Sequence, residues 1–185
     1  MLTVKHRPLT VHDYMQLPER SEKKTELIEG DLFMSPSPNR FHQEILGRLF
    51  GHIWHYLQSK PIGKVYAAPF DVVLTDLNVY QPDICYFSKS RYSSLTEHGA
   101  EGAPDLVLEI LSSRSMKHDL GVKKVIYART GVEEFWSVDP MKRVIAVFQL
   151  SENSDTPRAT LGVGKTVTTP LLPGLKIKVR DVFAE

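Results

Sequence analysis

The sequence predicts an α/β (α+β) fold in which a mixed central sheet is flanked by helices and preceded by an N-terminal helix and hairpin. Between Phe41 and Leu57, apolar residues recur at helical spacing over about four turns. Residues 106–111 (LVLEIL) are apolar on both sides apart from one charge, which is typical of an inner strand. The chain has 185 residues, 42% of them hydrophobic, so we expect a single domain with a full core.

Local signals predict the other elements in order. Thr10 caps a short helix that Pro18 ends, and a hairpin turns at Glu29-Gly30-Asp31. Further strands are expected over residues 65–75, 79–87, 133–139 and 143–150, with a last strand and turn in 174–183. A second helix is expected over residues 120–132, with Gly131 as its stop. The core then spans about residues 25–150, with an N-terminal appendage (1–24) and a C-terminal strand extension (151–185).

Composition narrows the class of protein. No apolar stretch approaches the about 18 residues of a membrane span, and the opening residues lack the apolar centre of a signal peptide, so a soluble cytoplasmic protein is expected. Cys85 is the only cysteine, which excludes an internal disulfide and favours a buried structural thiol over a nucleophile. With a net charge of +1, only local patches can attract nucleic acid.

Two carboxylates, Asp83 in QPDICYF and Glu109 in LVLEIL, stand inside strand-like apolar runs. A buried charge is costly unless it is compensated. A divalent cation, Mg²⁺ or Mn²⁺, compensates two neighbouring carboxylates and still leaves positions for water and a phosphate oxygen. The alternative is that each carboxylate pairs with a lysine or arginine.

The second predicted helix carries a candidate lysine. Asp119, Lys123 and Tyr127 follow one another at intervals of four residues, so they share one helical face directly after the Glu109 strand. Lys123 then points back at the carboxylates, while Lys124 faces solvent. The alternative is a surface pair between Asp119 and Lys123.

Six motifs occur in order over about residues 25–140: ELIEGDLFMSPSP, HQEILGRL, APFDVVL, QPDICYF, GAPDLVLEILS and DLGVKKVIYARTGVEEFWSVDP. This series resembles the Uma-type restriction endonucleases, a branch of the PD-(D/E)XK nuclease superfamily. The resemblance implies a restriction-endonuclease-like core in which an acid after a proline and an acid on the next strand hold magnesium. Pro82-Asp83 and Glu109 fit this scheme. The superfamily has a lysine two residues after the second acid, where this chain has Leu111, and Lys123 is our replacement for it.

The sequence therefore predicts a metal-dependent endonuclease that hydrolyses DNA phosphodiester bonds, acting as a homodimer because each subunit would supply one site. The predicted site residues are Asp83, Glu109, Lys123 and Tyr127 for catalysis, Asp83 and Glu109 for the metal, and Asp71, Glu29 and Glu26 as further acids. The predicted contacts to the DNA backbone are Arg114, Lys117, His118 and Lys124.

Each further candidate has an ordinary alternative. Asp71 equally suits a hairpin or cap, and Glu26 and Glu29 suit solvated hairpin carboxylates. A solvated position is favoured for His42, and core packing is favoured for Trp54 and Trp136. Two other functions stay open. One is a catalytically inactive nuclease fold for DNA binding or oligomerisation, linked to a mobile element, which Leu111 favours; the other is a metal-free structural domain with positive side chains buried against both carboxylates.

Overall fold

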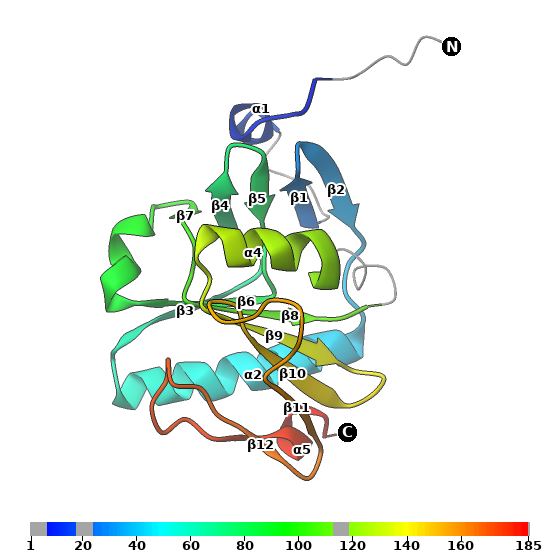
Figure 1. Cartoon of the computed structure of the whole chain (residues 1–185), viewed down its shortest axis with the longest axis vertical. Coiled ribbons are helices and arrows are strands. Elements are labelled where there is room, and N and C mark those ends of the chain that lie inside the picture. Colours follow the sequence, from blue (N-terminus) through cyan, green and yellow to red (C-terminus); the bar gives the residue numbers. More distant parts are fainter. Residues whose placement is uncertain (1–6, 18–23, 113–118, 185) are drawn as a thin grey trace.

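The computed structural model of the chain describes residues 7–17, 24–112 and 119–184, and the strands of this part form three sheets (Figure 1). The five-stranded sheet has the order β2 (Asp31–Ser35), β1 (Lys24–Ile28), β5 (Asn78–Tyr80), β4 (Asp71–Thr75), β7 (Gly99–Glu101). The six-stranded sheet has the order β11 (Ala159–Gly162), β10 (Val144–Gln149), β9 (Glu134–Asp139), β8 (Leu106–Ile110), β6 (Ile84–Ser88), β3 (Gly63–Ala67). A small sheet pairs β12 (Thr166–Val167) with β13 (Ile177–Lys178).

Helices lie around these sheets, as the sequence predicts for a mixed fold. They are α1 (Val11–Met15), α2 (Arg40–Ser59), α4 (Lys124–Thr130) and α5 (Val179–Val182), with a 3₁₀ segment η1 (Lys89–Ser94) and a π-helical turn η2 (Asp119–Lys123). Both sheets are mixed, because β8 runs parallel to β9 and β4 runs parallel to β7, whereas their other strand pairs are antiparallel. The predicted α/β (α+β) class is confirmed.

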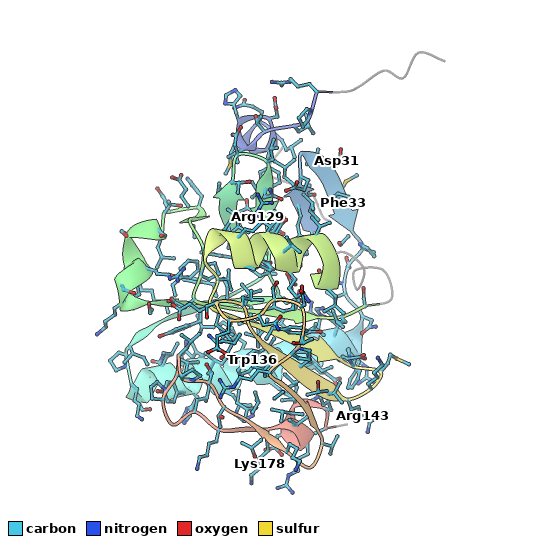
Figure 2. All side chains as sticks on the ribbon, in the orientation of Figure 1. Asp31, Phe33, Arg129, Trp136, Arg143 and Lys178 are labelled. Carbon is cyan, nitrogen blue, oxygen red and sulfur yellow. The ribbon has the colours of Figure 1, made fainter. Side chains whose placement is uncertain are left out.

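The inner strand β8 is covered on both faces. Because side chains alternate along a strand, Leu106, Leu108 and Ile110 face the core that α2 completes, whereas Val107 faces the core under α4. Figure 1 shows α2 and α4 on opposite sides of the six-stranded sheet. Trp136 of β9 lies in the interior, as Figure 2 shows and as the sequence predicts. By the same alternation, Glu109 belongs to the face under α4.

Two segments that the sequence analysis reads as single strands are each divided between the two sheets. Residues 65–75 contribute to β3 and β4, and residues 79–87 contribute to β5 and β6. A proline, Pro69 or Pro82, stands at each break, where its lack of an N–H group prevents it from continuing the ladder. The breaks are adjacent in space, since the Ala68 N–H donates to the Asp83 carbonyl oxygen at 3.1 Å. Asp83 therefore lies where one sheet gives way to the other.

Several local predictions are confirmed. The Thr10 side chain caps α1 by accepting a hydrogen bond from the Asp13 N–H. The hairpin of β1 and β2 closes at Glu29 and Gly30, both with positive φ. Gly131 ends α4 in the left-handed conformation. Cys85 is buried, and burial raises the pKa of its thiol well above the usual range.

One tryptophan corrects the sequence analysis. Trp54 is 50% exposed on α2 instead of packed in the core, because the core-facing stripe of this helix is made by Ile45, Leu49, Ile53 and Leu57. In the described ranges, no helix is both long enough and apolar enough to cross a membrane.

Candidate functional site

Asp83 and Glu109 lie side by side on adjoining strands. β6 pairs antiparallel with β8, with Ile84 opposite Leu108, so Asp83, the residue just before β6, is next to Glu109. Asp83 Oδ2 accepts a hydrogen bond from the Ile110 N–H at 2.8 Å, and the Asp83 N–H donates to Glu109 Oε2 at 3.4 Å. These contacts fix one oxygen of Asp83 against β8.

Two basic side chains meet Asp83 from other elements. Lys24 of β1 places its Nζ atom 3.4 Å from Asp83 Oδ1 and 4.0 Å from Glu109 Oε2. His42, in the first turn of α2, places Nε2 at 3.2 Å from Asp83 Oδ2. His42 is therefore part of the site, which corrects the solvated position that the sequence favoured. Its turn is set by Asn39, whose side chain caps α2 by accepting from the His42 N–H.

Lys123 is enclosed by carboxylates. Its Nζ atom lies 2.6 Å from Glu109 Oε1, 3.0 Å from Glu26 Oε1 and 3.3 Å from Asp119 Oδ1, and the side chain is only 1% exposed. The Tyr127 hydroxyl donates to the same Glu109 Oε1 at 2.9 Å. Lys123 and Tyr127 thus lie on one side of Glu109, as predicted. Asp119 reaches Lys123 through η2, whose backbone departs from helical geometry at Gly121.

Burial and the nearby charges shift the pKa values of Asp83 and Glu109 in opposite directions. Burial alone would raise the pKa of Asp83, but the Lys24 ammonium and the hydrogen bond from His42 outweigh it and hold this pKa far below its usual range. Burial raises the pKa of Glu109 to about 7, although Lys123 and Lys24 act against the shift. Burial is the largest cause of the raised pKa of Glu109, and the nearby carboxylates of Asp119 and Asp83 add to it.

The charge balance and the ligand chemistry of this cluster fit a divalent cation. Four acids (Glu26, Asp83, Glu109, Asp119) surround two lysines (Lys24, Lys123), which leaves a formal charge of −2 when all are ionised and His42 is neutral. In the part of the chain that is described, no group of three or more His, Cys, Asp and Glu side chains is arranged to hold a metal ion. Mg²⁺ needs only one or two carboxylates, because water supplies its other ligands. Asp83 and Glu109 therefore fit Mg²⁺ as a pair.

The carboxylates are less accessible than the partly open pocket that the sequence analysis expects. The side chains of Asp83 and Glu109 are only 8% and 2% exposed. A cavity of about 530 Å³ beside Trp54 and Tyr66 and another of about 750 Å³ beside Met15 are not lined by either acid. The solvent side of the pair is instead covered by Lys24 and His42, whose side chains are partly exposed.

Of the three further acids, the structure brings only Glu26 to the pair. Asp71 accepts hydrogen bonds from the Tyr14 hydroxyl and the Gln81 side chain at 2.9 and 2.8 Å, which makes it an anchor for α1. Glu29 is exposed in the hairpin turn and accepts from the Asn78 side chain. The solvated position favoured for Glu29 is thus confirmed, whereas the same expectation for Glu26 is wrong, because strand β1 turns Glu26 toward Lys123.

Of the four residues predicted to contact the DNA backbone, the structure describes Lys124 alone. Lys124 was expected to face solvent, but it is 8% exposed and its ammonium lies 4.4 Å from the centre of the Phe148 ring. The cause is Phe148 of β10, which packs in the same core cluster as α4, and Val125 and Arg129 are the exposed residues of this helix instead. Arg114, Lys117 and His118 lie outside the described residues.

The sequence prediction did not include Lys24, and for His42 it favoured a solvated position over one that faces the site. A signal for Lys24 was available, since residues two apart on a strand share a face and Lys24 precedes Glu26 by two. For His42, the only signal in the sequence was its position in the first turn of the predicted helix.

Comparison with known proteins supports the resemblance. The sequence model of a family described as "Putative restriction endonuclease" (Uma2) matches residues 11–180. A solved structure from Anabaena variabilis, described as a "putative nuclease belonging to DUF820", has the same fold with a TM-score of 0.79. It is 22% identical, and the match covers 96% of this chain and 98% of that chain. No curated protein is significantly similar. Because the family match spans far more than half of the chain, this protein belongs to the Uma2 restriction endonuclease family.

Proposed function

We propose that this protein is a nuclease that hydrolyses DNA phosphodiester bonds with Mg²⁺ or Mn²⁺ held by Asp83 and Glu109. One observation carries the proposal: Asp83 Oδ1 and Glu109 Oε2 both face the Lys24 ammonium, at 3.4 and 4.0 Å, so a cation in place of this ammonium would be shared by the two acids. The family and its fold support it, since the matching family model and the Anabaena variabilis protein are both described as nucleases.

When bound, the metal would polarise a phosphate oxygen and lower the pKa of a bound water. The chain's own residues hold the two ligands in place. The Ile110 N–H and His42 Nε2 contact Asp83 Oδ2, and the Lys123 ammonium and the Tyr127 hydroxyl contact Glu109 Oε1. In each acid the opposite oxygen is thereby aimed at the cation position. Lys123 takes the place of the absent lysine at Leu111 by contacting Glu109 from the end of η2, so we assign Lys123 and Tyr127 positioning roles.

The substrate and assembly follow from the same proposal. Arg114, Lys117 and His118 come directly after the β8 segment that carries Glu109, and they would contact the DNA backbone through its phosphates. Lys124 is not among these contacts because it is buried. Cutting both strands would take two such sites, so the active form is a homodimer.

A second candidate is a metal-free domain that keeps the nuclease fold for binding or assembly. The specific observation in its favour is that positive side chains already stand against both carboxylates, Lys24 at Asp83 and Lys123 at Glu109. In that case the cluster stabilises the fold and needs no metal.

Cleavage of supercoiled DNA tests the proposal. The wild-type protein is expected to nick the DNA with Mg²⁺ or Mn²⁺ and to lose this activity with EDTA. Glu109→Gln removes the charge of one ligand and should slow nicking by about 100-fold or more, the loss typical of a charge-stabilising group. Glu152→Gln, the same change at an exposed position, is the matched control. Activity that survives Glu109→Gln would refute the assignment, and a wild-type protein that cuts nothing would favour the metal-free domain.

Metal affinity should depend on pH near neutrality. The folded-state pKa of Glu109 lies near 7, so below this pH the ligand is mostly protonated and must release a proton to bind metal. The association constant for Mn²⁺ is therefore expected to rise about fivefold between about pH 6 and about pH 7, and to level off above about pH 8. Titration calorimetry in buffers of different ionisation enthalpy measures the released proton. An association constant that stays flat across this range would exclude the protonated Glu109.

A further inference from the structure

Lys24 and Lys123 hold the two carboxylates in different ways. Lys123 is fully buried and lies 2.6 to 3.3 Å from its three carboxylate partners. Lys24 is 23% exposed, and its Nζ atom lies 3.4 Å from Asp83 and 4.0 Å from Glu109. Strong charge-assisted hydrogen bonds are about 2.7–2.9 Å long, so Lys24 is the loosely held partner. Because the Lys24 side chain is partly exposed, its ammonium can leave the carboxylates for solvent.

The oxygens of the two acids divide into two sets. Asp83 Oδ2 is contacted by the Ile110 N–H and by His42 Nε2. Glu109 Oε1 is contacted by the Lys123 ammonium and by the Tyr127 hydroxyl. The other oxygens, Asp83 Oδ1 and Glu109 Oε2, both face the Lys24 ammonium, and Glu109 Oε2 also accepts the long hydrogen bond of 3.4 Å from the Asp83 N–H. A cation that bridges the two acids must use this second set, and it would meet the ammonium there. Two positive charges a few ångströms apart in a buried site repel strongly.

We propose that the Lys24 ammonium occupies the cation position of the metal-free protein, and that a divalent cation binds only by displacing Lys24 from these two oxygens. The inference rests on the proposed metal site of Asp83 and Glu109 and adds a built-in competitor to it. In the absence of metal, the ammonium offsets part of the excess negative charge of the cluster. When metal is added, the apparent association constant for the metal equals the intrinsic one multiplied by the fraction of molecules in which Lys24 has left the two oxygens.

Removal of the ammonium is the first test. In Lys24→Met the side chain keeps its length and apolar stem but loses its charge, so Mn²⁺ no longer competes. If the ammonium is seated in about nine of ten molecules, calorimetry should show Mn²⁺ binding about tenfold more tightly than to the wild type. The melting temperature of the metal-free variant should fall, and Mn²⁺ should raise it more than it raises that of the wild type. Lys178→Met is the matched control, because Lys178 is exposed at the end of the molecule opposite α1 (Figure 2).

A second measurement uses the wild-type protein, so it stands even if Lys24→Met fails to fold. Reductive methylation followed by peptide mass spectrometry reports how accessible each lysine is. Labelling of Lys24 should be slow without metal and should rise severalfold with Mn²⁺, and EDTA should reverse the increase. Lys123 serves as the internal control, because it is enclosed by Glu26, Glu109 and Asp119 and should stay unlabelled in both states.

The outcomes separate this inference from the proposed function. If the wild type binds Mn²⁺ but Lys24→Met binds no more tightly and labelling of Lys24 does not change, Lys24 is no competitor and the metal site stands. If neither protein binds Mn²⁺, the proposed metal site and the role of Lys24 both fail, and Lys24 is a structural ion-pair partner. Tighter binding by the variant together with metal-dependent labelling of Lys24 supports displacement.

Discussion

Asp83→Asn is expected to abolish Mn²⁺ binding and also to destabilise the metal-free protein. Asparagine keeps an oxygen for the Ile110 N–H but presents no negative charge to Lys24 and His42. Loss of a direct ligand should weaken Mn²⁺ binding by more than the about 10–100-fold that loss of an outer partner costs. Because Lys24 is partly exposed, the free energy of unfolding should fall by only about 1–3 kcal/mol. Calorimetry and urea denaturation measure the two effects.

The sign of the stability effect follows from the pKa of Asp83. This pKa is lower in the folded protein than in the unfolded chain, so the ionised carboxylate stabilises the fold above about pH 4 and ceases to do so only in stronger acid. At neutral pH the substitution therefore removes a favourable contribution. Asp76→Asn, the same change in an exposed turn, is the control. A metal-free Asp83→Asn protein as stable as the wild type would show that Lys24 does not compensate Asp83.

The sequence alone leads to the opposite expectation for this variant. Two unpaired neighbouring carboxylates repel each other, so removal of one should relieve the repulsion. The partner that reverses the sign, Lys24, is 59 residues away from Asp83 in the chain and comes from the other sheet. Strand alternation indicates only that Lys24 shares a face with Glu26, whereas its contact with Asp83 depends on how the sheets divide at Pro69 and Pro82.

Local patterns did predict the parts of the site that rest on a single element. Glu109 was recognisable because one charge in an otherwise apolar strand is anomalous, and the structure buries it. Lys123 and Tyr127 were placed with it because residues four apart share a helical face, and both contact Glu109. These inferences needed only the periodicity of a strand and of a helix.

The prediction that Lys124 faces solvent is wrong, because a lysine next to a buried helical face need not point to water. α4 lies between strands of both sheets, so little of its surface is free, and Val125 takes the outward position instead. The long apolar stem of Lys124 packs there and its ammonium reaches the Phe148 ring. Which residues of a short helix are exposed is decided by the elements around it.

Lys123→Met is expected to have the largest effect on stability of any single change in the cluster. The Lys123 ammonium contacts Glu26, Glu109 and Asp119, and methionine would leave these carboxylates buried without their shared partner. Removal of one partner from a buried ion pair costs about 3–5 kcal/mol, a large share of the about 5–15 kcal/mol that holds a domain folded. Urea denaturation of the metal-free proteins measures the loss.

The neighbouring lysine gives a matched control for this prediction. Lys124→Met makes the same change one residue later, where the ammonium lies against the Phe148 ring, so stability should change by about 1 kcal/mol or less. A second Glu109→Gln substitution should recover part of the stability lost in Lys123→Met, because one of the stranded charges is then removed. A double-mutant cycle measures this recovery, and it should be absent when Glu109→Gln is combined with Lys124→Met. Equal small losses in the two methionine variants would mean that the carboxylates around Lys123 are neutral in the folded protein, so that no ammonium is needed to keep them buried.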